Sequence, residues 1–159
     1  NSIGKRHAVY KNSPQSEGMT GYMFNMSLPL IKKNSTITNL LEPKLSLQFS
    51  PHEMKDISNT NNRINASNVY SFNRLGSGST FEEGASLTVG FDFIKQKEVE
   101  KFDSQGNLQS LEIEDFFEMK LATVLRDDKM EKISPYSTVN RRGSNIFGLI
   151  NFYLIKLII

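Results

Sequence analysis

The sequence predicts an all-β chain of about five or six antiparallel strands. Apolar and polar residues alternate with a period of two in four separate segments, as they do in strands that have one apolar face. No long segment shows the period of an amphipathic helix. Short turns alternate with long polar connections along the chain. The length of 159 residues suits one domain or a part of a larger one.

The first two strands are expected at residues 22–30 and 41–49. Even positions are apolar in the first strand, and odd positions are apolar in the second. Since directly opposed residues of an antiparallel pair point to the same face, this change of parity requires a loop with an even number of residues. We therefore predict a hairpin turn at Asn34-Ser35. Pro29 and Pro43 fall inside these strands, where each removes a backbone donor, so a bulge or local opening is expected.

The next two strands are expected at residues 85–93 and 111–125. Both are apolar at odd positions, so the loop between them has an odd number of residues. The segment 103–107 suits a three-residue loop in which Gly106 takes a left-handed bulge conformation. On this pattern Leu111 and Ile113 share a face with Phe117.

Composition excludes several classes of protein. The formal net charge of +2 indicates no nucleic-acid partner, and the absence of cysteine excludes disulfides and thiolate metal sites. A mean hydropathy of −0.39 excludes a bundle of membrane helices.

The apolar run at 147–159 is shorter than the about 20 residues of a spanning helix. Because this run lacks alternation, we interpret it either as a strand buried on both faces or as a terminal artefact. The chain starts at Asn1 without a signal peptide, so we expect a piece of a longer protein.

Two all-β architectures remain open on pattern alone. The alternating runs have the length of tilted strands that cross a bilayer, about 9–11 residues. The connections at 51–80 and 126–143 are long, whereas the turns are short, as in outer-membrane barrels. Aromatic residues near the expected strand ends suit the girdles of such a barrel, but they also suit the core of a soluble β-sandwich: Tyr22, Phe49, Phe93, Phe102 and Tyr153.

Four stretches resemble one family at the residue level. They are NLLEPKLSLQFSP at 39–51, NVYSFNRL at 68–75, EGASLTVGF at 83–91, and SPYSTVNRRGSNIFG at 134–148. In order and spacing they are similar to the barrel of the lipopolysaccharide-assembly outer-membrane proteins, the LptD or organic solvent tolerance family. The resemblance covers roughly residues 20–150. It implies antiparallel strands of a transmembrane β-barrel in the Gram-negative outer membrane.

This resemblance implies transport rather than catalysis. Residues 1–159 would form part of one C-terminal barrel domain, without the N-terminal jellyroll of the family. Family members insert lipopolysaccharide into the outer leaflet, are plugged by the lipoprotein LptE, and receive lipopolysaccharide from an LptA-type periplasmic bridge through the jellyroll. The partners implied here are therefore lipopolysaccharide, an LptE-like lipoprotein and an LptA-like bridge. The disulfides common in the family are not carried over.

The alternation assigns the two faces of this barrel wall. One parity, which includes Leu45, Leu87 and Leu121, is expected to face lipid. The other is expected to face a hydrated interior, the lumen: Lys44, Ser46, Gln48, Ser86, Thr88, Asp92, Glu118 and Lys120. Arg74 and Glu83 match the family motif, and we expect them to brace the long loop inside the barrel.

We predict no catalytic, cofactor or metal-binding residues. His7 and His52 lack a second ligand at metal spacing, and Glu112, Glu114 and Glu118 are interpreted as solvated or lumenal charge rather than acid–base catalysts. Two other functions stay open. A porin or nutrient-uptake barrel would have a loop folded into its pore with opposed acidic and basic rows. A soluble glycan-binding sandwich is disfavoured by the absence of tryptophan.

Overall fold

The computed structural model describes residues 19–78 and 80–153, which form one six-stranded antiparallel sheet. This confirms the all-β prediction. The strand order is β1-β3-β4-β5-β6, with β2 also paired to β3, so the sheet is open and β1 and β6 lie at its edges. The strand bounds are β1 Tyr22–Ser27, β2 Leu30–Asn34, β3 Ile37–Ser50, β4 Gly84–Phe102, β5 Leu108–Arg126 and β6 Phe147–Phe152.

The first hairpin has the predicted parity but a different turn. β1 and β2 pair with β3 in a single register, from Tyr22 opposite Phe49 to Asn34 opposite Ile37. The turn is therefore Ser35-Thr36, and the prediction of Asn34-Ser35 was wrong by one residue. Ser35 adopts a positive φ of 50°. A parity argument demands an even loop and cannot distinguish turns that are displaced by one residue on both strands.

The two prolines lie next to each other across this hairpin. The expected strand 22–30 is interrupted at Leu28 and Pro29, which separate β1 from β2. The N–H group of Leu28 donates to the carbonyl of Pro43 at 3.1 Å. Because the amide and carbonyl of one strand residue point to the same side, the donor that Pro43 lacks would face this break. One local opening accommodates both prolines.

The second hairpin is much longer than predicted. Gly106 has a φ of 81° and closes the turn, as expected. From Ser86 opposite Arg126 to Lys95 opposite Phe117 the index sum is even, as predicted. A register shift between Lys95 and Gln96 then changes the pairing. It is a β-bulge, in which one strand carries an extra residue.

The bulge corrects one predicted face. Beyond it Ile113 lies opposite Glu98, and Leu111 lies opposite Glu100. The even residues of β4 share a face with Thr88, so Leu111 and Ile113 lie on the face opposite to Phe117. The prediction that all three share a face was wrong, because strict alternation fails where a residue is inserted.

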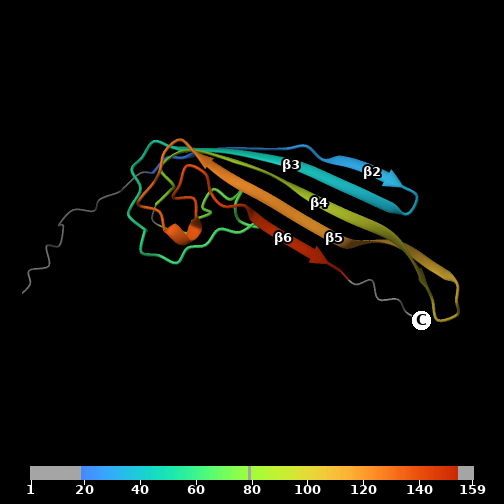
Figure 1. Cartoon of the computed structure of the whole chain (residues 1–159). Coiled ribbons are helices and arrows are strands. Elements are labelled where there is room, and N and C mark those ends of the chain that lie inside the picture. Colours follow the sequence, from blue (N-terminus) through green and yellow to red (C-terminus); the bar gives the residue numbers. More distant parts are fainter. Residues whose placement is uncertain (1–18, 79, 154–159) are drawn as a thin grey trace, which may run out of the picture.

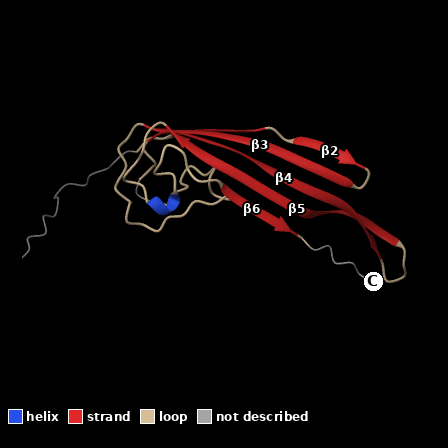
Figure 2. Cartoon of the chain, in the orientation of Figure 1, coloured by secondary structure: helices blue, strands red, loops and turns tan. Residues whose placement is uncertain are grey.

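The long connections gather at one end of the sheet and the short turns at the other (Figure 1). Figure 2 shows that the connections are almost entirely loop, with one short 3-10 helix at Pro135–Ser137. Residues 51–78, 80–83 and 127–146 pack on each other and against one face of the sheet. The hydrophobic core lies between these loops and the sheet, and its most buried side chains are Val69, Val124, Ile133 and Val139.

The C-terminal apolar run is described only in part. Phe147–Phe152 forms strand β6, and residues 154–159 of that run lie outside the described residues, as does His7. Phe147 belongs to the hydrophobic core, whereas Ile150 and Phe152 are exposed. The described part of the run is therefore not a strand buried on both faces. Within residues 19–78 and 80–153, no helix has the length and apolar character needed to cross a membrane.

Candidate functional site

One face of the sheet is apolar and exposed. Register places Phe24, Leu47, Leu87 and Leu125 side by side across four strands. Leu47 and Leu125 are 49% and 47% exposed, which is high for leucines in the middle of a sheet. Soluble monomers rarely expose such a contiguous apolar surface. We call it the apolar face. It consists of the even positions of β1 and β6, the odd positions of β3, the odd positions of β4 up to Lys95, and the odd positions of β5 from Phe117 onward.

Aromatic side chains border this face at both ends. Tyr22 and Phe49 are directly opposed near the loops. At the other end the Phe117 ring lies 6.0 Å from the ring of Phe93 and 5.1 Å from that of Phe152. The Phe117 row lies ten residues along β4 from the Phe49 row, or about 33 Å. In strands tilted by about 40° this spans about 25 Å, the height of the apolar band of outer-membrane barrels.

The other face carries all eight residues that were predicted to line a lumen. Register shows that they share this face, because Ser46 is opposite Thr88, Gln48 opposite Ser86, and Asp92 opposite Lys120. The four residues nearest the loops are buried beneath them: Ser46, Gln48, Ser86 and Thr88. The Gln48 amide donates to the carbonyl of Phe72 at 3.1 Å. We call this surface the covered face.

The four charged members of the set form a belt farther from the loops. Lys44 Nζ donates to Asp92 Oδ2 at 2.6 Å and also lies 3.6 Å from Glu42. On the neighbouring strand Lys120 pairs with Glu118 at 2.8 Å. Glu118 also accepts hydrogen bonds from the Asn151 amide at 2.9 Å and the Tyr153 hydroxyl at 3.2 Å. Acidic and basic groups thus alternate and pair within one belt.

Arg74 belongs to a buried ionic triad. Its Nε donates to Glu82 Oε2 at 2.7 Å, and its Nη2 donates to Glu82 Oε1. Arg126, at the end of β5, donates to the same Glu82 carboxylate and to the carbonyl of Glu83. The three side chains are only 1%, 3% and 0% exposed. Two guanidinium groups thus share one carboxylate in a site shielded from water.

Arg74 also fastens the loop directly to the sheet. It donates to Thr88 Oγ1 at 2.8 Å and to Ser86 Oγ at 2.9 Å. These two hydroxyls are among the predicted lumen-facing residues. They therefore act here as acceptors for a loop arginine, and the loop brings the cation that neutralises Glu82.

Glu83 makes separate contacts, between the two long loops. Its carboxylate accepts from the N–H group of Met54 at 3.0 Å and from Lys132 Nζ at 3.2 Å. Lys132 also donates to Glu53 at 2.6 Å. This hydrogen bond and the charge of Lys132 lower the pKa of Glu53, and the same bond raises the pKa of Lys132. Glu83 therefore links the two long loops to each other.

Two glycines admit aromatic side chains of the loop. A Cβ at Gly90 would lie 2.4 Å from the Tyr70 hydroxyl oxygen and 2.2 Å from the carbonyl oxygen of Leu121. A Cβ at Gly21 would lie 2.4 Å from the Phe72 ring. Burial, and secondarily the charge of Asp92, raise the pKa of Tyr70 to about 12, so its hydroxyl remains protonated. Glycine inside a strand often marks such a close approach.

The described residues contain no group of three His, Asp or Glu side chains that could hold a metal ion. No family model matches the chain, and comparisons with characterised proteins and with solved structures found no match either.

Sequence reasoning missed three residues of the covered face. Glu82, Arg126 and Tyr70 carry its central contacts. Glu82 and Tyr70 lie in a loop, outside any alternating pattern, and Arg126 lies one residue beyond the strand expected at 111–125. Gly90 could have indicated the approach of an aromatic side chain such as Tyr70, because a glycine inside a strand often marks a close contact. The pairing of Glu82 with Arg126 joins residues 44 positions apart and had no local signal.

Proposed function

We propose that this chain is part of the wall of an outer-membrane β-barrel that inserts lipopolysaccharide into the outer leaflet. The observation that carries the proposal is the exposure of the two faces of the sheet. The apolar face is exposed, whereas the polar face is covered by the loops. A bilayer offers no hydrogen-bond partners, so strands that cross it present apolar side chains outward and satisfy their backbone within the sheet. The spacing of the aromatic rows agrees with this arrangement.

The open edges of the sheet also support the proposal. β1 and β6 each have a neighbour on one side only. A membrane-spanning sheet cannot leave a row of backbone groups unpaired in lipid. The wall would therefore be completed by further strands of a larger barrel.

The covered face supports an interior that is filled by loops. The stretch 68–75, which carries part of the family resemblance, is the segment that lies across this face through Tyr70, Phe72 and Arg74. Beyond it the belt of Lys44, Asp92 and their neighbours supplies a polar surface. A phosphorylated, sugar-rich head group could pass along such a surface, while its acyl chains remain in lipid.

A matched pair of arginine substitutions on β1 tests the membrane orientation. Met26 lies on the apolar face and Asn25 on the covered side, and both are exposed. Met26→Arg should reduce assembly into the outer membrane strongly, since a midplane arginine on the lipid face costs about 2–4 kcal/mol. Asn25→Arg should assemble almost normally. The readout is recovery in the outer-membrane fraction together with heat-modifiable gel mobility, and equal losses in both variants would reject the orientation.

Thr88 is a poorer control than Asn25. Its hydroxyl accepts the hydrogen bond from Arg74, and its side chain is buried. Thr88→Arg would therefore disrupt loop packing whether or not the sheet lies in a membrane.

The transport role is tested in cells. Depletion of the protein should stop newly made lipopolysaccharide from reaching the cell surface, and the protein should co-purify with an LptE-like lipoprotein. An LptA-like periplasmic bridge is the proposed donor, acting through a domain outside this sequence. Intact lipopolysaccharide export after depletion, with no lipoprotein partner, would reject this function.

A porin or nutrient-uptake barrel is the second candidate. The observation that favours it is the loop folded over the covered face beside charged side chains. The charges, however, alternate in sign within one belt and pair with each other, rather than forming opposed acidic and basic rows. Channel conductance in planar bilayers, with normal lipopolysaccharide export, would favour this function. A soluble sandwich would instead bury the apolar face under a second sheet, and recovery of the protein outside the membrane fraction would indicate it.

A further inference from the structure

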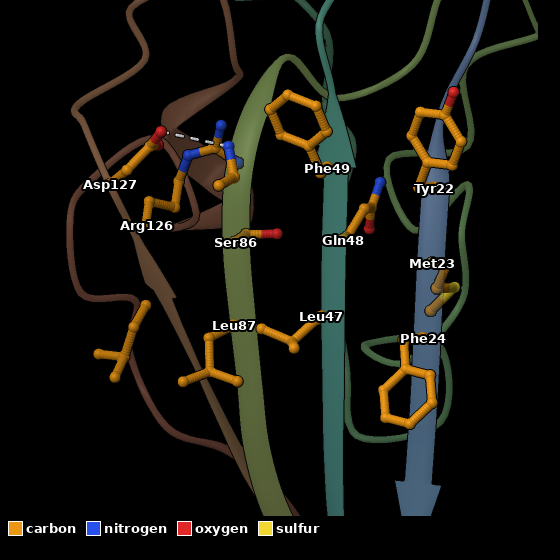
Figure 3. Close-up of a pocket in the computed structure, with 12 residues that line it drawn as sticks. Tyr22, Met23, Phe24, Leu47, Gln48, Phe49, Ser86, Leu87, Arg126 and Asp127 are labelled. Atoms are coloured by element: carbon orange, nitrogen blue, oxygen red, sulfur yellow. Dashed lines mark hydrogen bonds between the residues drawn. The ribbon is translucent and has the colours of Figure 1, made fainter.

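The side of the sheet that carries exposed apolar residues changes along its length. Near the loops, Leu47 and Leu87 lie side by side on adjacent strands with Phe24 beside them (Figure 3), and all three belong to the apolar face. Beyond the bulge, β4 and β5 continue as a hairpin end, residues 96–114, whose exposed apolar side chains lie mainly on the opposite side. We call four of them the hairpin patch: Phe102, Leu108, Leu111 and Ile113.

Register places the hairpin patch on the same side of the sheet as the covered face. Even residues of β4 lie on that side, and each member of the patch either is such a residue or lies directly opposite one. All four side chains are between 55% and 65% exposed, so residues 19–78 and 80–153 do not bury them. An exposed apolar patch bordered by polar residues is typical of an interaction surface.

The other side of the hairpin end is charged. Lys101 forms an ion pair with Glu112 there, and Lys97 lies opposite Glu114. Charged side chains on the outer side of a strand do not suit contact with acyl chains. The apolar face therefore ends near the Phe117 row, and β4 continues for seven residues beyond that row, or about 23 Å.

Within the described residues, most of the hairpin end has no neighbouring strand. β3 begins at Ile37, which pairs with Lys97, and β6 ends at Phe152, opposite Phe117. Figure 1 shows β4 and β5 running past the turn between β2 and β3. A two-stranded ribbon is only marginally stable in water by itself. A partner that packs on the hairpin patch would supply the apolar contact that the ribbon lacks.

The charge of the hairpin end limits what can cover the patch. Residues 96–114 contain two lysines and five acidic residues, a net charge of −3. On the patch side, Glu98 pairs with Lys33 at 2.5 Å, whereas the exposed Glu100 has no ion-pair partner among the described residues. This charge repels anionic lipid head groups and a second copy of the same acidic surface, and it attracts a surface with basic groups.

We propose that the hairpin patch is the docking surface for a protein partner whose apolar side chains are bordered by lysine or arginine. Leu111 and Ile113 contact the apolar part of the partner, and Glu100, directly opposite Leu111, pairs with one of its basic groups. The proposal goes beyond the transport function. It rests on that function only in placing the hairpin end outside the bilayer, where a protein can reach the patch.

Single cysteines on the two sides of the hairpin end test the proposal. Leu111→Cys reports on the patch, and Glu112→Cys reports on the charged side one residue away. Each variant of the full-length protein is alkylated with a sulfonated maleimide in cells whose outer membrane is permeabilised. The product is followed by mass spectrometry of the tryptic peptide 102–120, which contains both positions and no other cysteine. Each rate is divided by that of the same variant unfolded in urea, so that intrinsic thiol reactivity cancels.

The normalised rate of Leu111→Cys should be about tenfold lower than that of Glu112→Cys, which corresponds to a patch that is covered for about nine-tenths of the time. Adding Glu100→Gln to Leu111→Cys should raise the rate severalfold, because the partner loses an ion pair. Adding Glu114→Gln, the matched change on the charged side, should leave the rate unchanged. p-Benzoylphenylalanine at Ile113 should crosslink in cells to a protein segment that contains lysine or arginine.

Three results would overturn the proposal. Equal normalised rates for Leu111→Cys and Glu112→Cys would show that the patch is uncovered. An unchanged rate after Glu100→Gln would reject a basic partner, and a crosslink from Ile113 to lipid or to a second copy would reject a protein partner of this kind. Each result leaves the membrane wall intact if Met26→Arg and Asn25→Arg still differ in assembly. If those two variants assemble equally, the membrane orientation fails whatever the alkylation rates are.

Discussion

The two faces of this sheet differ in what holds them in place. On the covered face, hydroxyl, amide and guanidinium groups are buried and paired with a loop, as Thr88 and Ser86 are with Arg74. On the apolar face, Leu47, Phe24 and their neighbours remain exposed, and none of residues 19–78 and 80–153 covers them. Within the described residues, burial therefore stabilises the loop side of the sheet, while the apolar side gains stability only when another apolar phase covers it. The following predictions test this difference.

The largest effect is expected at the buried triad. Glu82→Gln retains the size of the side chain but removes the charge that Arg74 and Arg126 share. Loss of one partner of a buried ion pair typically costs about 3–5 kcal/mol, because the remaining charge is left uncompensated. We expect the free energy of unfolding, measured by urea titration, to fall by about this amount.

The adjacent residue is the matched control for the triad. Glu83→Gln removes a carboxylate that pairs with Lys132, and both of these side chains are about 30% exposed. Such pairs contribute about 1 kcal/mol or less. If Glu82→Gln and Glu83→Gln destabilise the protein equally, the triad does not hold the loop in the way described.

Glycine substitutions compare the two faces at the level of the backbone. Gly90→Ala would place a methyl group against the carbonyl of Leu121 and the hydroxyl of Tyr70. Overpacking of this kind costs about 1–3 kcal/mol. Gly148→Ala, on the apolar face, would meet the flexible side chain of Leu121 at 3.2 Å and, at an ordinary contact distance of 3.9 Å, the carbonyl oxygen of Lys120. Thermal unfolding should show a lower midpoint for Gly90→Ala and little change for Gly148→Ala, and the reverse order would contradict the assignment of the faces.

Two truncations compare burial directly. Val124 is 0% exposed and contacts the loop core, whereas Leu47 is 49% exposed on the apolar face. Val124→Ala should cost about 2 kcal/mol in urea unfolding. Leu47→Ala removes more carbon atoms, yet in detergent it should cost less, because it empties no buried space. A larger loss for Leu47→Ala would show that the apolar face is packed against something within the chain.

The smallest effect is expected from the link between the two loops. The pKa of Glu53 is lowered from 4.5 by Lys132, so its stabilising contribution is present above pH 4.5 and lost as the pH falls through the lower folded value. The pKa of Lys132 is raised from 10.5, so its contribution is present below pH 10.5 and lost as the pH rises through the higher folded value.

Lys132→Met tests the pH range over which the Glu53–Lys132 pair stabilises the protein. The difference in urea midpoint between the native protein and Lys132→Met should be small at pH 7 and should narrow at pH 3. The same difference at both pH values would mean that Lys132 acts through packing rather than through its charge.

Prediction from the sequence succeeded where a two-residue period is unbroken. The parity of residues 85–93 against 117–125 requires an even index sum, and the structure has it. The method failed at Phe116, where one extra residue in β5 reverses the assignment of Leu111 and Ile113. Such a bulge leaves no clear local signal, because the residues around it stay compatible with a strand in either orientation.

The contacts of the long loops were the least predictable part. Arg74 and Glu83 were expected to brace a loop, and the structure places Arg74 on Glu82 and Glu83 on Lys132. An ion pair between two loops depends on where each loop returns to the sheet. Loop closure costs little extra entropy as length grows, so a loop as long as 51–83 has many possible paths, and its length predicts none of them.

The sequence by itself determined the all-β class, the antiparallel pairing of the two hairpins and the division into an apolar and a polar parity. It could do so because the side chains of a strand alternate between two faces, so the polarity of each residue indicates the face on which it lies. Only the tertiary structure decided which polar residues are buried, since the loops that cover Ser46 and Thr88 come from distant parts of the chain. It also decided that Arg74 and Arg126 share the carboxylate of Glu82, because a carboxylate selects its partners by position in space and not by distance along the sequence.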